Sequence, residues 1–409
     1  MSATSLSSPE EAARLAAPPA LPSRAQTPSR LSRAIFFPVK LLWGMLFCQS
    51  FLGSILVVGW SYRLARRSAF RQWWKSAERS RSEADFLRLL SEEEETRHST
   101  SWPNWFLSPD FAQAAHGQPR AHFARRLLSL VQALSHSLWL NLRLGLQGIL
   151  NTWVLTLPAG LFWWFGWYAG WNNSFNKGYE QAFAGPLICI AGILMFIAAM
   201  FYVPLAQARQ AVSGEWRSFY SFRVVWTIIR DRWLSCVGLT ALYSALSLPL
   251  SILKTVPMFL PQKYPFLESL SDPAALKYVN AYFFWCALAV FPSYALLRVV
   301  AARIYASGLL ASVRNGRLSP NSLSAFERSF LDRLDLLRVR PQPARHPFVR
   351  GVQWTGTRLG SLTATAVIVG IWFSLVAQIY ISEFLSYHGA LGWLNQPLVQ
   401  LPWFHYLPK

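Results

Sequence analysis

The stretch WNNSFNKGYEQAFAG, residues 171–185, separates two long apolar runs, and its meaning decides the fold class. LPAGLFWWFGWYAG (residues 157–170) precedes it, and PLICIAGILMFIAAMFYVPL (residues 186–205) follows it. Two structures account for such a polar segment between apolar runs. It is a loop between two buried helices of a soluble protein, or a short turn outside a membrane between two transmembrane helices. The rest of the chain distinguishes these alternatives.

The amino-acid composition argues against an ordinary soluble protein. Apolar residues make up 53% of the chain and charged residues 14%, whereas soluble domains contain about 25% charged residues. Tryptophan is abundant, with 20 residues, and its ring favours the interface between a membrane and water. The composition therefore favours a membrane protein.

Several apolar runs are long enough to cross a bilayer, which requires about 20 residues. Their interiors contain no Asp, Glu, Lys or Arg apart from Lys40 and Arg298, each near one end of its run. The runs are residues 36–60, 147–170, 186–206, 233–253, 278–301 and 360–381. The sequence predicts an all-α, polytopic transmembrane helical bundle of about six spans.

Segments rich in Lys and Arg alternate along the chain with segments that contain few of them. Residues 62–145, 207–232 and 302–359 carry thirteen, five and ten Lys or Arg, whereas residues 171–185 carry only Lys177. Basic segments stay in the cytoplasm, so residues 171–185 are expected outside, as is the C-terminus. This distribution follows membrane topology and argues against nucleic acid as a partner. We expect the cell inner membrane, although an organellar membrane stays open.

The first run leaves an alternative. Six spans place the N-terminal tail outside, with the strongly basic residues 63–75 on the cytoplasmic side of the first span. In the other interpretation, the run re-enters at CQSFLGS (residues 48–54) and both chain ends stay inside.

The expected organisation combines spans with interfacial helices. Basic amphipathic segments precede two apolar hairpins, as HFARRLLSLVQALSHSLWLNLRLGLQ does at residues 122–147, and we expect them to form interfacial elbow helices. The two units share Trp and Leu-Pro positions, and AVSG at residues 211–214 matches YASG at residues 305–308, which indicates a tandem repeat.

These features predict the boundaries of the segments along the chain. They are a disordered Ser/Ala/Pro-rich tail (1–32), a first span (33–60), a basic and acidic cytoplasmic segment (61–121), repeat 1 (122–214), repeat 2 (215–310), a basic cytoplasmic segment (311–359), the last span (360–381) and an external C-terminal cap (382–409).

Three groups of residues are candidate sites. A basic and aromatic group is expected at the anionic-lipid interface: Arg63, Arg66, Arg67, Arg71, Trp73, Trp74 and Lys75. The external turn offers a docking surface: Asn172, Asn173, Asn176, Lys177 and Tyr179. Polar side chains inside the spans can bond between helices or line a substrate path: Gln49, Asn151, Asn280 and Gln378.

The sequence contains no recognisable catalytic or metal-binding pattern. It has no HExxH, GxxxxGK[ST], GxGxxG or GxSxG motif, and no CxxC pair among its 4 cysteines. We therefore expect no cofactor and no enzymatic activity. The first interpretation is a scaffold or accessory subunit of a membrane assembly, with membrane-protein partners and anionic lipids as contacts. The alternative is a transporter or lipid-handling protein with its site at the repeat interface.

Overall fold

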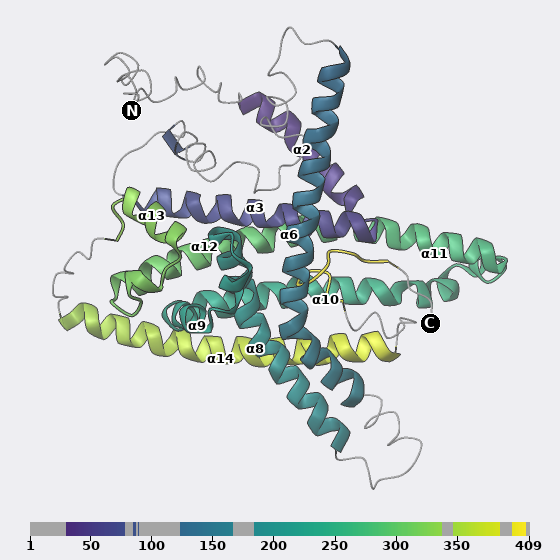
Figure 1. The fold of residues 1–409 in the computed structure, drawn as a ribbon. Coiled ribbons are helices and arrows are strands. Elements are labelled where there is room, and N and C mark those ends of the chain that lie inside the picture. The colour runs from purple at the N-terminus through teal and green to yellow at the C-terminus, as the bar shows by residue number, and fades with distance from the viewer. Residues whose placement is uncertain are drawn as a thin grey trace. The chain divides into compact units, whose positions relative to one another are not determined.

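The computed structural model describes residues 30–77, 85–86, 89, 123–166, 184–337, 347–384 and 395–405. Within these ranges the chain is helical and contains no β-strand (Figure 1). The α-helices are α2 (Arg30–Phe47), α3 (Phe51–Ser76), α6 (Phe123–Phe165), α8 (Ala184–Ser213), α9 (Phe222–Asp231), α10 (Trp233–Lys263), α11 (Asp272–Ala287), α12 (Val290–Arg314), α13 (Ala325–Arg333) and α14 (Pro347–Phe384). Short 3₁₀ turns are η4 (Trp216–Tyr220), η5 (Pro265–Leu267) and η6 (Pro320–Ser322).

The chain divides into two units, Met1–Lys40 and Leu41–Lys409. The structure describes only the start of α2 in the first unit. The second unit contains the rest of α2 and all the other helices.

The first apolar run is not a single helix. A turn at residues 48–50 ends α2, and Ser50 begins α3 as its N-cap, since its Oγ accepts from the amide of Gly53 at 3.0 Å. The break lies inside CQSFLGS, where the re-entrant alternative places it.

Four helical stretches in the described residues are long and apolar enough to cross a membrane. They are Gly185–Ser213, Trp233–Lys263, Asp272–Arg314 and Arg358–Gln378. These stretches contain three of the six runs that the sequence predicts as spans and most of a fourth, residues 360–381. The run at residues 147–170 lies at the end of α6, and the described part of that helix ends at residue 166.

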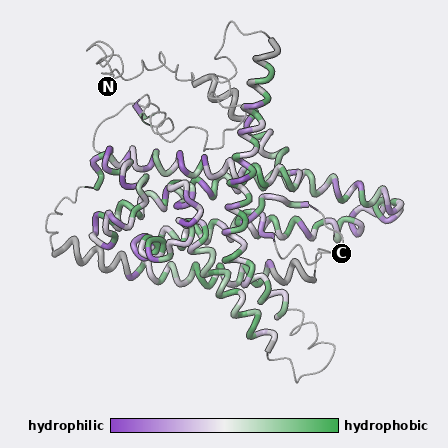
Figure 2. The backbone as a smooth tube through the Cα atoms, in the orientation of Figure 1, coloured by the Kyte–Doolittle hydropathy of each residue, from purple (hydrophilic) through white to green (hydrophobic). Residues whose placement is uncertain are grey.

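Large apolar side chains remain exposed on these helices. Leu150 and Val154 on α6, Leu194 on α8 and Leu362 on α14 are 57%, 58%, 57% and 70% exposed. Figure 2 shows hydrophobic residues along most of the α6–α8 pair. Contiguous exposed apolar surface of this kind marks a membrane or protein contact.

Glycines allow the helices to approach closely. A Cβ on Gly59 of α3 would overlap the carbonyl oxygen of Asn141 on α6, and one on Gly145 of α6 would overlap that of Ile55 on α3. Small residues at such crossings are typical of helix packing in membranes. α6 also packs along α8, and the two helices run across the direction of α3, α10 and α12 in Figure 1.

A second helix pair is joined by polar contacts. α10 packs along α14, where Ser244 Oγ donates to Ser374 Oγ at 2.8 Å and Ser251 Oγ donates to Gln378 Oε1 at 3.4 Å.

The two expected repeats differ in construction. In repeat 1, the expected elbow helix continues directly into the following apolar run, and both belong to α6. In repeat 2, the elbow helix α9 and the apolar helix α10 are separate helices that meet at Arg232. Gly214 follows the end of α8 with φ 77°, but its match in the sequence, Gly308, lies inside α12. The glycine that follows α12 with φ 68° is Gly316.

Candidate functional site: a buried polar cluster around Arg298

The polar residues expected inside the spans do not converge on one cavity. Gln49 Nε2 donates to the carbonyl oxygen of Phe284 at 3.3 Å, and Gln378 bonds to Ser251 and Ser374. Asn280 is exposed on α11. Of the four, Asn151 alone belongs to a larger buried network among the described residues.

Asn151 connects α6 to α8 and η4. Its Nδ2 donates to Gln210 Oε1 of α8 at 3.1 Å, and its Oδ1 accepts from the Tyr220 hydroxyl of η4 at 3.0 Å. Tyr62 of α3 donates to the same Gln210 oxygen at 3.1 Å. Burial raises the pKa of Tyr220, so its hydroxyl keeps the proton that it donates.

Arg298 and Gln207 form the next part of the network. Arg298 Nη2 donates to the Tyr294 hydroxyl at 2.8 Å and to the carbonyl oxygen of Val399 at 3.0 Å. Gln207 Nε2 donates to Thr152 Oγ1 at 2.6 Å and to the same Val399 oxygen at 3.3 Å. The two side chains therefore hold one backbone carbonyl of the C-terminal segment, residues 395–405.

The C-terminal segment, residues 395–405 of the expected external cap, lies among the helices. Leu398, Val399, Gln400 and Leu401 are at most 4% exposed. Apolar side chains drive this burial, and polar side chains satisfy the irregular backbone, because an apolar interior offers it no water. Thus Ser54 Oγ donates to the Pro402 carbonyl at 3.3 Å.

Side chains of the C-terminal segment add further bonds. Gln400 Nε2 donates to Thr156 Oγ1 of α6 at 2.6 Å, and its Oε1 accepts from the amide of Gln396 at 2.7 Å. Asn395 Nδ2 donates to the carbonyl oxygens of Leu401 and Trp403, both at 3.1 Å. The segment therefore has a defined conformation without being helical.

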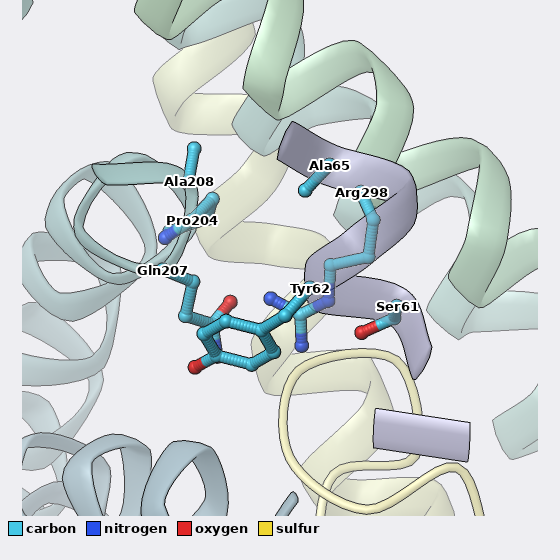
Figure 3. A pocket seen from close by; sticks show the side chains of 7 residues that line it. All are labelled: Ser61, Tyr62, Ala65, Pro204, Gln207, Ala208 and Arg298. Atoms are coloured by element: carbon cyan, nitrogen blue, oxygen red, sulfur yellow. The ribbon is translucent and has the colours of Figure 1, made fainter. Parts of the chain in front are cut away.

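A small cavity lies beside this network. Residues of three helices line it: Ser61, Tyr62 and Ala65 of α3, Pro204, Gln207 and Ala208 of α8, and Arg298 of α12 (Figure 3). The cavity has a volume of about 10 Å³. This is room for about one water molecule, which is too small for an organic solute.

Several polar atoms around the cavity have no hydrogen-bond partner in the described part of the chain. They are Gln207 Oε1, Arg298 Nε and Arg298 Nη1 on its lining, and Gln210 Nε2 in the same network. Unpaired buried groups are costly, so a small polar group placed among these atoms would stabilise them.

A second buried cluster connects α8, α12 and α13. Glu327 is 0% exposed and accepts from the Tyr305 hydroxyl and, at 2.8 Å, from the amide of Ser324. Arg209 Nη2 lies 3.9 Å from Glu327 Oε2 and donates to the carbonyl oxygen of Ser322 at 3.2 Å. Ser324 and Glu327 form a capping box, so this cluster fixes the start of α13.

The group expected at the lipid interface is divided between the two sides of α3. Arg66 and Trp73 are 4% and 0% exposed, so they do not belong to a lipid-facing surface in this structure. Trp73 Nε1 donates to the carbonyl oxygen of Ala306 at 2.8 Å, and the Arg66 guanidinium lies 4.7 Å from the Phe326 ring centroid. The physical reason is the helical period, which turns these residues towards α12 and α13.

The other five residues expected at the lipid interface lie farther from the core. Arg67, Arg71 and Lys75 are exposed at four-residue intervals, and Arg63 and Trp74 are half-buried. The exposed basic residues therefore form a ridge along α3. The expected external docking surface, residues 172–179, lies outside the described residues.

The described part of the chain contains no group of three or more His, Cys, Asp or Glu that could hold a metal ion. Sequence reasoning missed Tyr62, Gln207, Gln210 and the Val399 carbonyl as members of the polar cluster. The signal that could have located it is Arg298, a charge within an apolar run. No protein family, curated protein or solved structure matches the chain.

Proposed function

We propose that the chain is an integral multi-pass membrane protein that serves as a scaffold or accessory subunit of a membrane assembly and carries out no catalysis. The supporting observation is that groups of the protein itself occupy its buried polar network. The C-terminal segment and neighbouring side chains fill it, and the cavity beside it has about 10 Å³. A network occupied by the protein itself acts to fix one arrangement of helices.

The proposed topology has six spans in the cell inner membrane. The basic segments lie in the cytoplasm, and residues 171–185 and the C-terminus lie outside. The four long apolar stretches support membrane insertion. Gln207 lies six residues before the end of α8 at Ser213, about 9 Å along the helix. The C-terminal segment would thus reach from the outer side towards the cytoplasmic end of α8.

The exposed ridge Arg67, Arg71 and Lys75 is proposed to contact anionic lipid. Each basic residue near such a surface contributes about 1 kcal/mol. The ridge then anchors α3 at the cytoplasmic interface, while Arg66 and Trp73 hold the opposite side of this helix on the protein.

The scaffold role is tested by purifying tagged protein from its native membranes in mild detergent and identifying co-purifying proteins by mass spectrometry. Partners in stoichiometric amounts are the expected result. The triple variant Asn172→Ala, Asn176→Ala, Lys177→Ala tests the external turn as the docking surface. Asn280→Ala, an exposed amide on α11, is the matched control and should retain the partners.

A transporter or lipid-handling protein is the second candidate, because Arg298 is a charged residue buried in a candidate span. Purification of a monomer or homodimer carrying a defined lipid or solute, without partner proteins, would favour this candidate and reject the scaffold.

A further inference from the structure

Arg298 carries a buried positive charge whose hydrogen-bond partners in the described residues are all neutral. It is 3% exposed and bonds to the Tyr294 hydroxyl and the Val399 carbonyl. The Tyr294 ring lies beneath its guanidinium, with 4.5 Å between Cζ and the ring centroid. A guanidinium does not lose its proton in proteins, so the charge persists in a region of low dielectric constant. A buried charge of this kind requires compensation.

Another buried arginine shows how a buried charge is compensated in this protein. Arg209, 4% exposed, lies near the Glu327 carboxylate, and the exposed Arg317 pairs with Asp231. Arg298 forms no ion pair with a carboxylate in the described residues. The ionisable groups nearest to it are the phenols of Tyr62, Tyr243 and Tyr294, which carry no charge at neutral pH.

The cavity lies on the unsatisfied side of this guanidinium. Arg298 Nε and Nη1 have no partner among the described residues, and Arg298 lines the cavity together with Gln207. Figure 3 shows the two side chains pointing towards one another from α12 and α8. The space accommodates a particle about the size of a water molecule, and a halide ion has a comparable size.

Gln207 determines whether water or an anion is the better guest. Its Nε2 donates to Thr152 and Val399, which leaves Oε1 without a partner in the described part of the chain. Water would donate to this oxygen. A half-turn of the carboxamide would instead present N–H groups to an anion. The Thr152 hydroxyl, which donates to the Gly148 carbonyl oxygen at 2.7 Å, would then turn to donate to Oε1, and the Val399 carbonyl would keep Arg298 as its donor.

We propose that the cavity between α3, α8 and α12 binds one small monovalent anion, such as chloride, through Arg298 and Gln207. The anion supplies the charge that the neutral partners of Arg298 lack, which water would not do. The site is independent of the scaffold role, because binding of chloride and binding of a protein partner are measured separately.

The test measures binding of radioactive chloride by the full chain in mild detergent, and its thermal unfolding when chloride replaces gluconate at constant ionic strength and pH. Saturable binding of one ion per chain is expected, with a higher unfolding temperature in chloride. A wild-type protein that binds no chloride and unfolds alike in both salts would overturn the proposal and leave water as the guest.

Variants locate the site. Arg298→Met removes the charge, and Ala208→Val narrows the cavity while keeping Arg298, so each should weaken chloride binding at least tenfold. Arg303→Gln removes an exposed charge of α12 and should bind as the wild type does. Undiminished binding by Arg298→Met would also reject this site. If neither cavity variant folds, the wild-type measurements and bromide competition still decide whether the ion binds.

Discussion

Arg298 and Val399 lie 101 positions apart in the sequence, and Arg298 Nη2 donates to the Val399 carbonyl oxygen at 3.0 Å. Gln207 Nε2 donates to the same oxygen at 3.3 Å. One carbonyl therefore connects α8, α12 and the C-terminal segment. Irregular backbone is stable inside an apolar bundle only where such donors meet it. This relationship makes the last part of the chain a structural element of the bundle.

Gln400→Ala should loosen the C-terminal segment. The substitution removes the bond to Thr156 and leaves the Gln396 amide without its acceptor, which costs ~1–3 kcal/mol. Hydrogen exchange at residues 395–405 should become faster, while exchange in α8 changes little. Gln396→Ala retains the backbone amide and is the control. Equal exchange in Gln400→Ala and wild type would show that these bonds do not hold the segment.

The helical class and the four candidate membrane-spanning stretches could be predicted, because a soluble protein rarely needs runs of about 20 apolar residues. The sequence leaves two interpretations of the first run, a single span or a segment that re-enters at CQSFLGS, residues 48–54. Ser50 is a good N-cap, but the apolar residues continue on both sides of it, and hydropathy does not register a cap.

The polar cluster could be predicted only in part. Asn151 and Arg298 stand out because they interrupt apolar runs, and both belong to it. Gln207 and Gln210 follow the predicted span at the start of a basic segment, where polar residues are ordinary. The Val399 carbonyl has no side-chain signature, and its partners come from distant helices. The burial of Trp73 could not be predicted, because an amphipathic helix shows which residues share a side, not what covers that side.

Glu327→Ala should destabilise the contact between α13 and its neighbours. It removes half of the capping box and leaves Arg209 buried without its carboxylate. Breaking a buried charge pair costs ~3–5 kcal/mol. The loss should appear as a lower free energy of unfolding in detergent.

The variant Arg209→Met tests the cause of that loss. In the double variant, the unpaired arginine is absent, so the cost should be smaller than the sum of the two single costs. Additive costs would mean that Arg209 and Glu327 do not interact.

Gly59→Ala should weaken the crossing of α3 and α6. The added methyl group would overlap the Asn141 carbonyl oxygen, and overpacking of this kind costs ~1–3 kcal/mol. Gly238→Ala in α10 is the matched control, because a Cβ there meets nothing within 4 Å. It should stabilise the helix by ~0.5–1 kcal/mol. Equal effects of both substitutions on the unfolding temperature would contradict the close approach of α3 and α6.

Acidification should release the end of the C-terminal segment through His405. Burial lowers the pKa of His405, and backbone hydrogen bonds with Cys48 and Gln49 act in the opposite direction. The unfolded chain, with a histidine pKa of about 6.5, therefore binds a proton more readily than the folded chain. The stabilising contribution of neutral His405 is present above that pH and is lost as the pH falls towards the lowered pKa of the folded state. Fluorescence of nearby Trp403, whose ring centroid lies 5.5 Å from that of His405, should change over this pH range. In His405→Gln the change should disappear, since glutamine does not titrate, and its persistence would assign the pH response to another group.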